Sequence, residues 1–207
     1  MSVADRLDAD RIRAGLVSPV IGNQITVLEN TSSTNDEIER LSQTGASEGF
    51  VVFAEHQTAG RGQRGNAWES IARKGLWFSI LLQPKIPLRD SGTLTTWAAQ
   101  AVSNTIGKYC GVESRVKPPN DIYVAGGKVA GVLVEMKAQP RASHLAILGV
   151  GINVNQRAED FSESLRDRAT SLLLATGRQQ DRMALAVEVL LELDRTYSQL
   201  FPQRNRV

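Results

Sequence analysis

Three glycines and two arginines share a short polar loop within the segment AEHQTAGRGQRGNAWES, residues 54–70. Glycines let backbone N–H groups come close to a ligand, and successive N–H groups can form a nest that binds anions. Arg61 and Arg64 add planar, permanently charged donors suited to phosphate or carboxylate. An exposed hairpin with solvated arginines is the plainer alternative, but the interleaving of the two residue types favours an anion-binding loop. Trp68 is expected either in the core or against a bound ring.

A second polar segment, KPPNDIYVAGGKVAG, occupies residues 117–131. A double proline stiffens the turn before Asn120 and Asp121, and an acidic residue beside an amide can hold a hydrated magnesium ion and a nucleotide phosphate. Pro-Asn-Asp is also ordinary turn chemistry. Lys128 opens an apolar strand and is followed by small residues. It is either an edge lysine with a solvated tip or an inward cation that polarises a carbonyl.

Two further segments carry glycines or small polar residues. In LGVGINVN, residues 148–155, Gly149 and Gly151 share one strand face, so either a ligand lies across that face or the strand bends there. In SSTN, residues 32–35, the small polar residues suit a helix N-cap, and a small polar ligand can bind the same N-terminus. Each segment has an ordinary structural explanation by itself.

The composition is that of an ordinary globular protein. The 207 residues are 42% hydrophobic and 22% charged, with a net charge of +2. No apolar run approaches the roughly 20 residues needed to cross a bilayer, and the near-neutral charge gives no support for nucleic-acid binding. Cys110 is the single cysteine, which excludes an internal disulfide and a cysteine-rich zinc site. This cysteine usage favours a cytoplasmic location.

Several common catalytic motifs are missing from the sequence. It has no P-loop, no nucleophile elbow and no HExxH motif, and its histidines are His56 and His144. Triad hydrolysis and histidine-based metal catalysis are therefore disfavoured. A nucleotide-binding enzyme without a Walker loop fits the polar segments better.

Hydrophobic periodicity predicts the elements that hold these segments. Helical spacing occurs at 7–16, 32–45, 91–109 and 182–201, and strand-like runs occur at 24–30, 50–57, 75–84, 113–117, 121–124, 128–137 and 144–155. Asp8, Ser33 or Thr34, and Asp181 are the expected N-caps. The strands cluster in the middle without strict βαβ alternation, and short connections favour hairpins. The sequence therefore predicts an α+β fold, with a mostly antiparallel mixed β-sheet flanked by helices.

The order of the polar segments is more specific than any one of them. STN, QTAGRGQRGNAW, KPPNDIY with GGKVAGVLVE, and GVGINVN follow one another as in the catalytic domain of biotin protein ligases, which the sequence resembles over nearly its whole length. The resemblance implies the biotin/lipoate ligase fold, which is like that of class II aminoacyl-tRNA synthetases. It also implies that biotin and ATP, with Mg²⁺, form biotinyl-5′-AMP. A lysine of the biotin carboxyl carrier protein of acetyl-CoA carboxylase or a related carboxylase then attacks the mixed anhydride.

The same resemblance implies roles for individual residues. The residues implied to bind biotin are Ser33, Thr34, Asn35, Gln57, Gly60, Arg61, Gly62, Gln63, Lys128, Gly131, Gly149 and Gly151. Those implied to bind ATP are Arg64, Trp68, Lys117, Asn120 and Asn153. Lys128, Arg61 and Arg64 are the implied catalytic cations, and Asp121 is the implied magnesium ligand. The glycine and arginine loop is expected to be mobile alone and to become ordered when the anion binds.

Two positions depart from the pattern of the family. Pro118 stands where members commonly have tryptophan, which removes packing beside Lys117 and Asn120. Gln63 stands where arginine is frequent, and the lost charge is expected to loosen retention of the reactive adenylate.

The two ends of the sequence give expectations about further domains. About two dozen residues precede the first predicted strand, which is too few for the winged-helix DNA-binding domain of some members. Residues 1–207 are therefore expected to be a single catalytic domain without a DNA partner or a membrane partner. The SH3-like C-terminal domain of many members is expected to be absent or truncated. Homodimer formation stays open.

Other functions compete with biotin ligation. A lipoate or octanoate ligase shares the fold, although the GRGQRG loop and GVGINVN favour biotin. A non-catalytic module that binds biotin or nucleotide is compatible with Pro118 and with the expected lack of a C-terminal domain. A DNA-binding regulator is disfavoured by the near-neutral charge.

Overall fold

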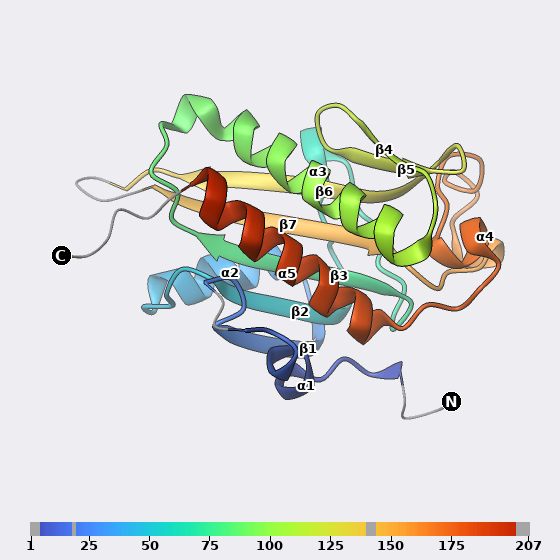
Figure 1. Ribbon diagram of the computed structural model, residues 1–207, viewed down its shortest axis with the longest axis horizontal. Coiled ribbons are helices and arrows are strands. Elements are labelled where there is room, and N and C mark those ends of the chain that lie inside the picture. Colours follow the sequence, from blue (N-terminus) through green and yellow to red (C-terminus); the bar gives the residue numbers. More distant parts are fainter. Residues whose placement is uncertain (1–4, 18–19, 140–143, 202–207) are drawn as a thin grey trace.

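Seven strands form one mixed sheet in the order β1-β2-β3-β7-β6-β5-β4 in the computed structural model, which describes residues 5–17, 20–139 and 144–201 (Figure 1). The strands are β1 (Gln24–Thr31), β2 (Phe50–Gln57), β3 (Gly75–Leu82), β4 (Ser114–Lys117), β5 (Asp121–Val124), β6 (Gly127–Lys137) and β7 (Leu145–Asn153). β1 and β2 run parallel, and each other neighbouring pair is antiparallel. The predicted α+β fold with a mostly antiparallel mixed sheet is confirmed.

Five α-helices accompany the sheet in the described part of the chain. They are α1 (Ala9–Ala14), α2 (Thr34–Gln43), α3 (Ser91–Cys110), α4 (Leu172–Thr176) and α5 (Arg182–Leu200). Asp8 caps α1 through the Arg11 amide at 2.9 Å, and Asp181 caps α5 through the Met183 amide at 2.9 Å. Both caps are as predicted, whereas α4 was not predicted, because five residues are too few for a periodic pattern.

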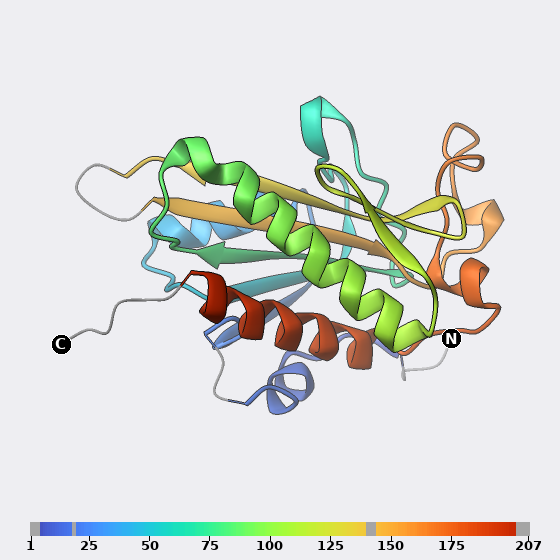
Figure 2. The same ribbon diagram turned by 45° about the horizontal axis from the view of Figure 1, so that its top comes forward.

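Alternation along the strands divides the sheet into two faces. Phe78, Ile80 and Leu82 of β3 point to the main core, which α3 and α5 cover. Figures 1 and 2 show these two long helices side by side across this face. Trp97 of α3 packs against Tyr197 of α5, with ring centroids 5.4 Å apart. The two helices therefore cover most of this face, and α1 packs beside them against β1.

The opposite face is covered by α2 at one end. Ile38 of α2 packs with Val52, Leu81 and Ile147 in a second, smaller apolar cluster. Farther along the same face of β3 the alternation places Ser79, which pairs with Gly149 of β7. The sheet thus passes from an apolar surface under α2 to a polar, glycine-rich surface beside it.

A buried ion pair ties α5 to the sheet. Arg182 is 1% exposed, and its guanidinium contacts Glu55 of β2 at 2.8 Å, the carbonyl oxygen of Gly75 at 3.0 Å and Asp5 at 3.0 Å. Glu55 in turn accepts a hydrogen bond from the Leu7 amide at 2.7 Å. One arginine thereby joins the last helix, two strands and the N-terminal segment.

None of the helices in the described ranges combines the length and the apolar character needed to cross a membrane.

Candidate functional site

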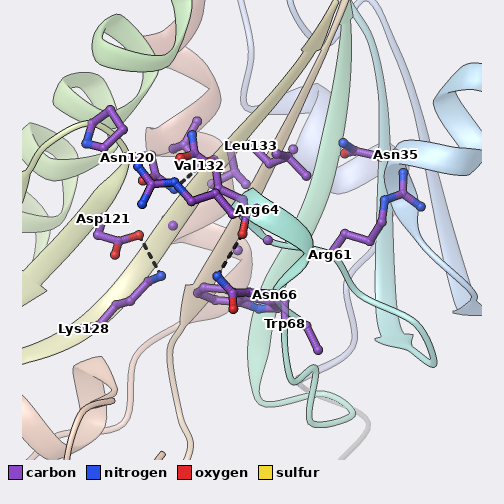
Figure 3. Close-up of a pocket in the computed structure, with 18 of the residues that line it drawn as sticks. Asn35, Arg61, Arg64, Asn66, Trp68, Asn120, Asp121, Lys128, Val132 and Leu133 are labelled. Atoms are coloured by element: carbon purple, nitrogen blue, oxygen red, sulfur yellow. Dashed lines mark hydrogen bonds and ion pairs between the residues drawn. The ribbon is translucent and has the colours of Figure 1, made fainter. Parts of the chain in front are cut away.

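A cavity of about 300 Å³ opens on the polar part of the sheet face beside α2 (Figure 3). It gathers the predicted segments from α2, the loop of residues 60–68, the turn between β4 and β5, and strands β6 and β7. The predicted site residues that line it are Ser33, Thr34, Asn35, Gln57, Arg61, Gly62, Gln63, Arg64, Trp68, Lys117, Asn120, Asp121, Lys128, Gly131, Gly149 and Gly151. Gly60 and Asn153 are not among its lining residues.

Gly131, Gly149 and Gly151 form a floor without side chains, here called the glycine floor. A Cβ atom at Gly149 would lie 2.4 Å from Oδ1 of Asn35, and one at Gly151 would lie 2.5 Å from the indole of Trp68. Gly131 pairs with Gly151 across β6 and β7, beneath the same indole. The pairing of β7 with β6 and β3 continues in register past these glycines, so no β-bulge interrupts the ladder there. The close approach is made by two side chains of the chain itself.

Polar side chains meet at the N-terminus of α2, and we call them the polar end of the cavity. Gln57 accepts hydrogen bonds from the backbone amide and the hydroxyl of Thr34, at 2.8 and 3.1 Å. The hydroxyl of Ser79 lies 2.7 Å from the Thr34 hydroxyl and 2.5 Å from Oδ1 of Asn35. Ser33 takes the N-cap position. Ser33, Thr34 and Asn35 are all buried, and all three line the cavity.

The loop of residues 60–68, here called the Gly–Arg loop, closes on itself by backbone hydrogen bonds. The Gly62 amide donates to the Asn66 carbonyl at 2.7 Å, and the Trp68 amide donates to the Gly60 carbonyl at 2.9 Å. Arg64 sits at the tip with φ of 58°, in the left-handed region. A Cβ atom at Gly60 would lie 2.6 Å from the Trp68 carbonyl oxygen, so Gly60 closes the base of the loop instead of lining the cavity.

Arg61 is held by two carboxylates. Its guanidinium contacts Asp36 at 2.5 Å and Glu135 at 3.2 Å. Burial works to lower the pKa of Arg61, but the hydrogen bonds and charges of Asp36 and Glu135 outweigh it and raise that pKa. In Figure 3 the side chain points toward Asn35 and away from Asp121 and Lys128.

The opposite side of the cavity carries Arg64, Lys117 and Lys128, which we call the cationic end. The Lys128 ammonium lies 2.7 Å from a carboxylate oxygen of Asp121 and 5.4 Å from the ring centroid of Trp68 (Figure 3). Lys128 therefore points inward, which decides between its two predicted positions. Asn120 is buried and donates to the Val132 carbonyl at 3.0 Å, so it anchors the turn that carries Lys117.

Trp68 is only partly in the core, and its predicted contact with a bound ring stays a prediction. Its half-buried indole covers the glycine floor, packs edge-on against Trp77 with centroids 6.1 Å apart, and also lines the cavity. Its Nε1–H is buried and finds no hydrogen-bond partner among the described residues. The ring is thus a wall of the cavity that is fixed by the sheet below it.

Asn153 lies at the end of β7 in a separate buried polar cluster. Its amide donates to the Thr170 carbonyl at 3.1 Å, and its side-chain oxygen accepts from Gln156 at 3.0 Å. The geometry gives Asn153 a structural role, and its implied contact with nucleotide stays a prediction.

Some contributing polar residues were not predicted from the sequence. Among them, Asp36, Asn66, Ser79 and Glu135 contact predicted residues or line the cavity. Two of them carried a signal, because Ser79 interrupts the apolar strand GLWFSILL and Glu135 shares a strand face with Gly131. Asp36 lies in the first turn of α2, where acidic residues are common, so no local pattern points to its contact with Arg61.

Asp121 offers one carboxylate for a metal ion. In the residues that the structure describes, no group of three or more His, Cys, Asp and Glu side chains is placed to hold a metal. A single carboxylate matches the way magnesium is held by one or two protein carboxylates together with substrate phosphates. The residues therefore fit magnesium that arrives on a nucleotide, and they do not make an all-protein metal site.

Comparisons with known proteins show which family the chain resembles. The family model "Biotin/lipoate A/B protein ligase family" matches residues 27–153. The chain is 39% identical over 192 residues to the bifunctional ligase/repressor BirA of Bacillus spizizenii, covering 93% of this chain and 59% of that protein. It is 36% identical to the biotin–[acetyl-CoA-carboxylase] ligase of Mycobacterium tuberculosis, covering 91% of this chain and 70% of that protein.

A solved structure gives the same result. The biotin protein ligase of Aquifex aeolicus in complex with biotin and ATP matches with a TM-score of 0.74 and 33% identity, covering 87% of this chain and 73% of that chain. The family model covers more than half of the present chain, including the glycine floor and both ends of the cavity. The chain therefore belongs to the biotin/lipoate A/B protein ligase family.

Proposed function

We propose that this chain is the catalytic part of an ATP-dependent biotin protein ligase. It would activate biotin to biotinyl-5′-AMP and transfer the biotinyl group to a lysine of a carboxyl carrier domain. The chain spans 59% of the BirA protein of Bacillus spizizenii, so the activity is proposed from the cavity and the family.

The observation that carries the proposal is the polarity of the cavity. Its polar end presents the buried, uncharged groups of Ser33, Thr34 and Asn35, which suit a neutral ring that both donates and accepts hydrogen bonds. Its cationic end presents Arg64, Lys117 and Lys128, which suit carboxylate and phosphate. The glycine floor joins the two ends. A ligand with a polar ring at one end and an acid at the other, such as biotin, fits this order.

The cationic end suits the first chemical step. A carboxylate oxygen of biotin attacks the α-phosphorus of ATP, the bond from that phosphorus to the bridging oxygen breaks, and pyrophosphate leaves. Both reactants are anions, so preorganised cations lower the cost of their approach. Lys128 and Arg64 would provide this charge, and Asp121 would contact the magnesium that MgATP brings.

The second step needs an external amine. A neutral lysine of the carrier attacks the acyl carbon of the mixed anhydride, AMP leaves, and the amine loses a proton. The biotin–[acetyl-CoA-carboxylase] ligases among the relatives support a carboxylase carrier as the partner. A cytoplasmic location belongs to the same proposal and is supported by the single cysteine. Homodimer formation stays open, and the lack of a DNA partner stays a prediction.

Pyrophosphate release tests this function against its rivals. The chain is incubated with MgATP and either biotin, lipoate or octanoate, and then with a biotin carboxyl carrier domain. We expect pyrophosphate release with biotin alone of the three acids, followed by labelling of the carrier. Release with lipoate or octanoate would instead identify a lipoate-type ligase. Biotin binding in a calorimeter without any pyrophosphate would identify a non-catalytic binding module.

A further inference from the structure

A chain of side-chain hydrogen bonds runs under the cavity from Ser70, two residues after the Gly–Arg loop, to Arg61 within the loop. Ser70 accepts from Gln57 at 3.0 Å, and the chain continues through the hydroxyls of Thr34 and Ser79 to Asn35. Asn35 then donates to Glu135 at 2.6 Å, and Glu135 contacts Arg61. The loop is therefore joined, at Arg61 and just beyond its C-terminal end, to the residues that we assign to biotin.

Glu135 is the member of this chain that joins the floor to the loop. One carboxylate oxygen of Glu135, Oε2, accepts hydrogen bonds from the side-chain amide of Asn35 at 2.6 Å and from the guanidinium of Arg61 at 3.2 Å. The orientation of the Asn35 amide is fixed, because its oxygen faces the Ser79 hydroxyl and packs against Gly149. The amide N–H₂ of Asn35 is thus directed to Glu135, and its position depends on that carboxylate.

The guanidinium of Arg61 forms ion pairs with two carboxylates, those of Glu135 and Asp36. Its charge is therefore already compensated within the chain. Arg64, Lys117 and Lys128 line the cavity as well, and Figure 3 shows Arg61 turned from Lys128 and Asp121 toward Asn35. This geometry suits an arginine that fastens the loop better than one that binds the reacting anions.

We propose that Glu135 is a positioning residue that fastens the Gly–Arg loop to the biotin end of the cavity through Arg61. The inference rests on the proposed function, because it assigns the polar end to biotin. Asn35 transmits the coupling: a ligand that fixes Asn35 strengthens the Glu135 contact, and a closed loop strengthens ligand binding in turn. Glu135 thereby links occupation of the polar end to closure over the cationic end.

Loop exchange without any ligand tests the fastening itself. Hydrogen–deuterium exchange is measured over residues 60–68 in the unchanged chain and in Glu135→Gln and Glu135→Ala. Glu39→Gln is the matched control. Glu39 of α2 pairs with Lys137 of β6 at 2.8 Å, so this pair joins the same two elements as the contact between Asn35 and Glu135. The side chain of Glu39 is 37% exposed, against 30% for Glu135. We expect exchange of the loop amides to rise about fivefold in Glu135→Ala, less in Glu135→Gln, and not in Glu39→Gln. Equal loop exchange in all four proteins would overturn the proposal.

Adenylation kinetics test the coupling to biotin. In Glu135→Gln the KM for biotin is expected to rise about fivefold while kcat stays within about twofold, because Glu135 touches no reacting atom. Arg61→Gln is expected to raise the KM for biotin at least as much, because it also breaks the contact with Asp36, and the double variant should raise it no more than Arg61→Gln alone. Multiplying effects, or a loss confined to kcat, would overturn the coupling. If the unchanged chain releases no pyrophosphate, the proposed function fails, while the exchange result still decides whether Glu135 fastens the loop.

Discussion

Lys128 places its ammonium group between a carboxylate and an aromatic ring. The contact with Asp121 at 2.7 Å holds the side chain extended into the cavity, and Trp68 limits its motion from the other side. A cation fixed in this way needs little reorganisation when negative charge develops nearby. Its expected role is to stabilise the carboxylate and α-phosphate as they meet.

Replacing Lys128 should therefore slow adenylation. We expect Lys128→Ala to lower the rate of pyrophosphate release by about 100-fold. Lys137→Ala is the control, because Lys137 lies on the same strand but pairs with Glu39 outside the cavity. An unchanged adenylation rate in Lys128→Ala would remove Lys128 from the catalytic assignment.

A substitution at Gly149 tests whether Asn35 at the polar end of the cavity positions biotin. An added Cβ would lie 2.4 Å from Oδ1 of Asn35, so Gly149→Ala should displace that amide and weaken biotin binding by about 10-fold, as measured by calorimetry. Gly92→Ala is the matched control, since nothing lies within 4 Å of its Cβ position. Equal biotin affinity in both variants would show that Asn35 does not position biotin.

Individual residues of the site were predictable where an unusual residue type marked them. Glycines within a strand, an arginine between glycines and a lysine at a strand start stood out in the sequence, and they line the cavity, whereas the loop glycine Gly60 does not. Glu135 and Asp36 did not stand out, because an acidic residue on a half-exposed strand or in a first helical turn is common. Their importance comes from contacts between residues far apart in the chain, which no local pattern contains.

At the scale of elements, residues 61–67 of the Gly–Arg loop carry no large apolar side chain, and Trp68 anchors the end of the loop on the sheet. Its own hydrogen bonds and the Arg61 contacts hold it, and its residues 61 and 64–67 are exposed. A segment with so little buried surface opens at low free-energy cost. Ligand contacts from Arg64 and the loop amides should then add to its stability.

Biotin together with MgATP should therefore protect this loop from hydrogen exchange. We expect residues 60–68 to exchange at least about 10-fold more slowly when the adenylate has formed, while residues 91–110 of α3 keep their rate. The chain incubated with ATP alone serves as the reference. Unaltered loop exchange in the presence of both substrates would contradict the role of the loop as a cover.

The helices and strands themselves were largely predictable from periodicity. All eight residues of β3 are buried, and β7 is almost as apolar, so neither strand shows alternation. Their short length and the turn residues around them identified both as strands. The missing element was α4, and the pairing of β1 with β2 in parallel could not be read from either strand alone. Strand order depends on how α2 and α3 pack on opposite faces, which is a property of the assembled core.

At the scale of the whole molecule, Arg182 joins parts that are far apart in the chain. Both Arg182 and Glu55 are almost fully buried, and their contact of 2.8 Å lies between α5 and β2. Removing one member of such a pair leaves a buried charge without compensation. The stability of the domain should therefore depend strongly on this contact although it lies outside the cavity.

A change at Arg182 should destabilise the fold as a unit. We expect Arg182→Met to lower the free energy of unfolding by about 3 kcal/mol in urea denaturation. Arg195→Ala, which removes an exposed pair with Glu192, should cost less than about 1 kcal/mol. A similar small loss in both variants would show that the buried pair does not hold α5 to the sheet.

The central claim is that the cavity makes and retains biotinyl-5′-AMP. The most direct measurement is a native mass spectrum of the chain after incubation with biotin and MgATP and removal of free ligand. The account predicts a bound mass equal to biotinyl-5′-AMP, reduced in Lys128→Ala and unchanged in Lys137→Ala. A spectrum showing only the free chain, only biotin or only ATP in the unchanged protein would contradict it.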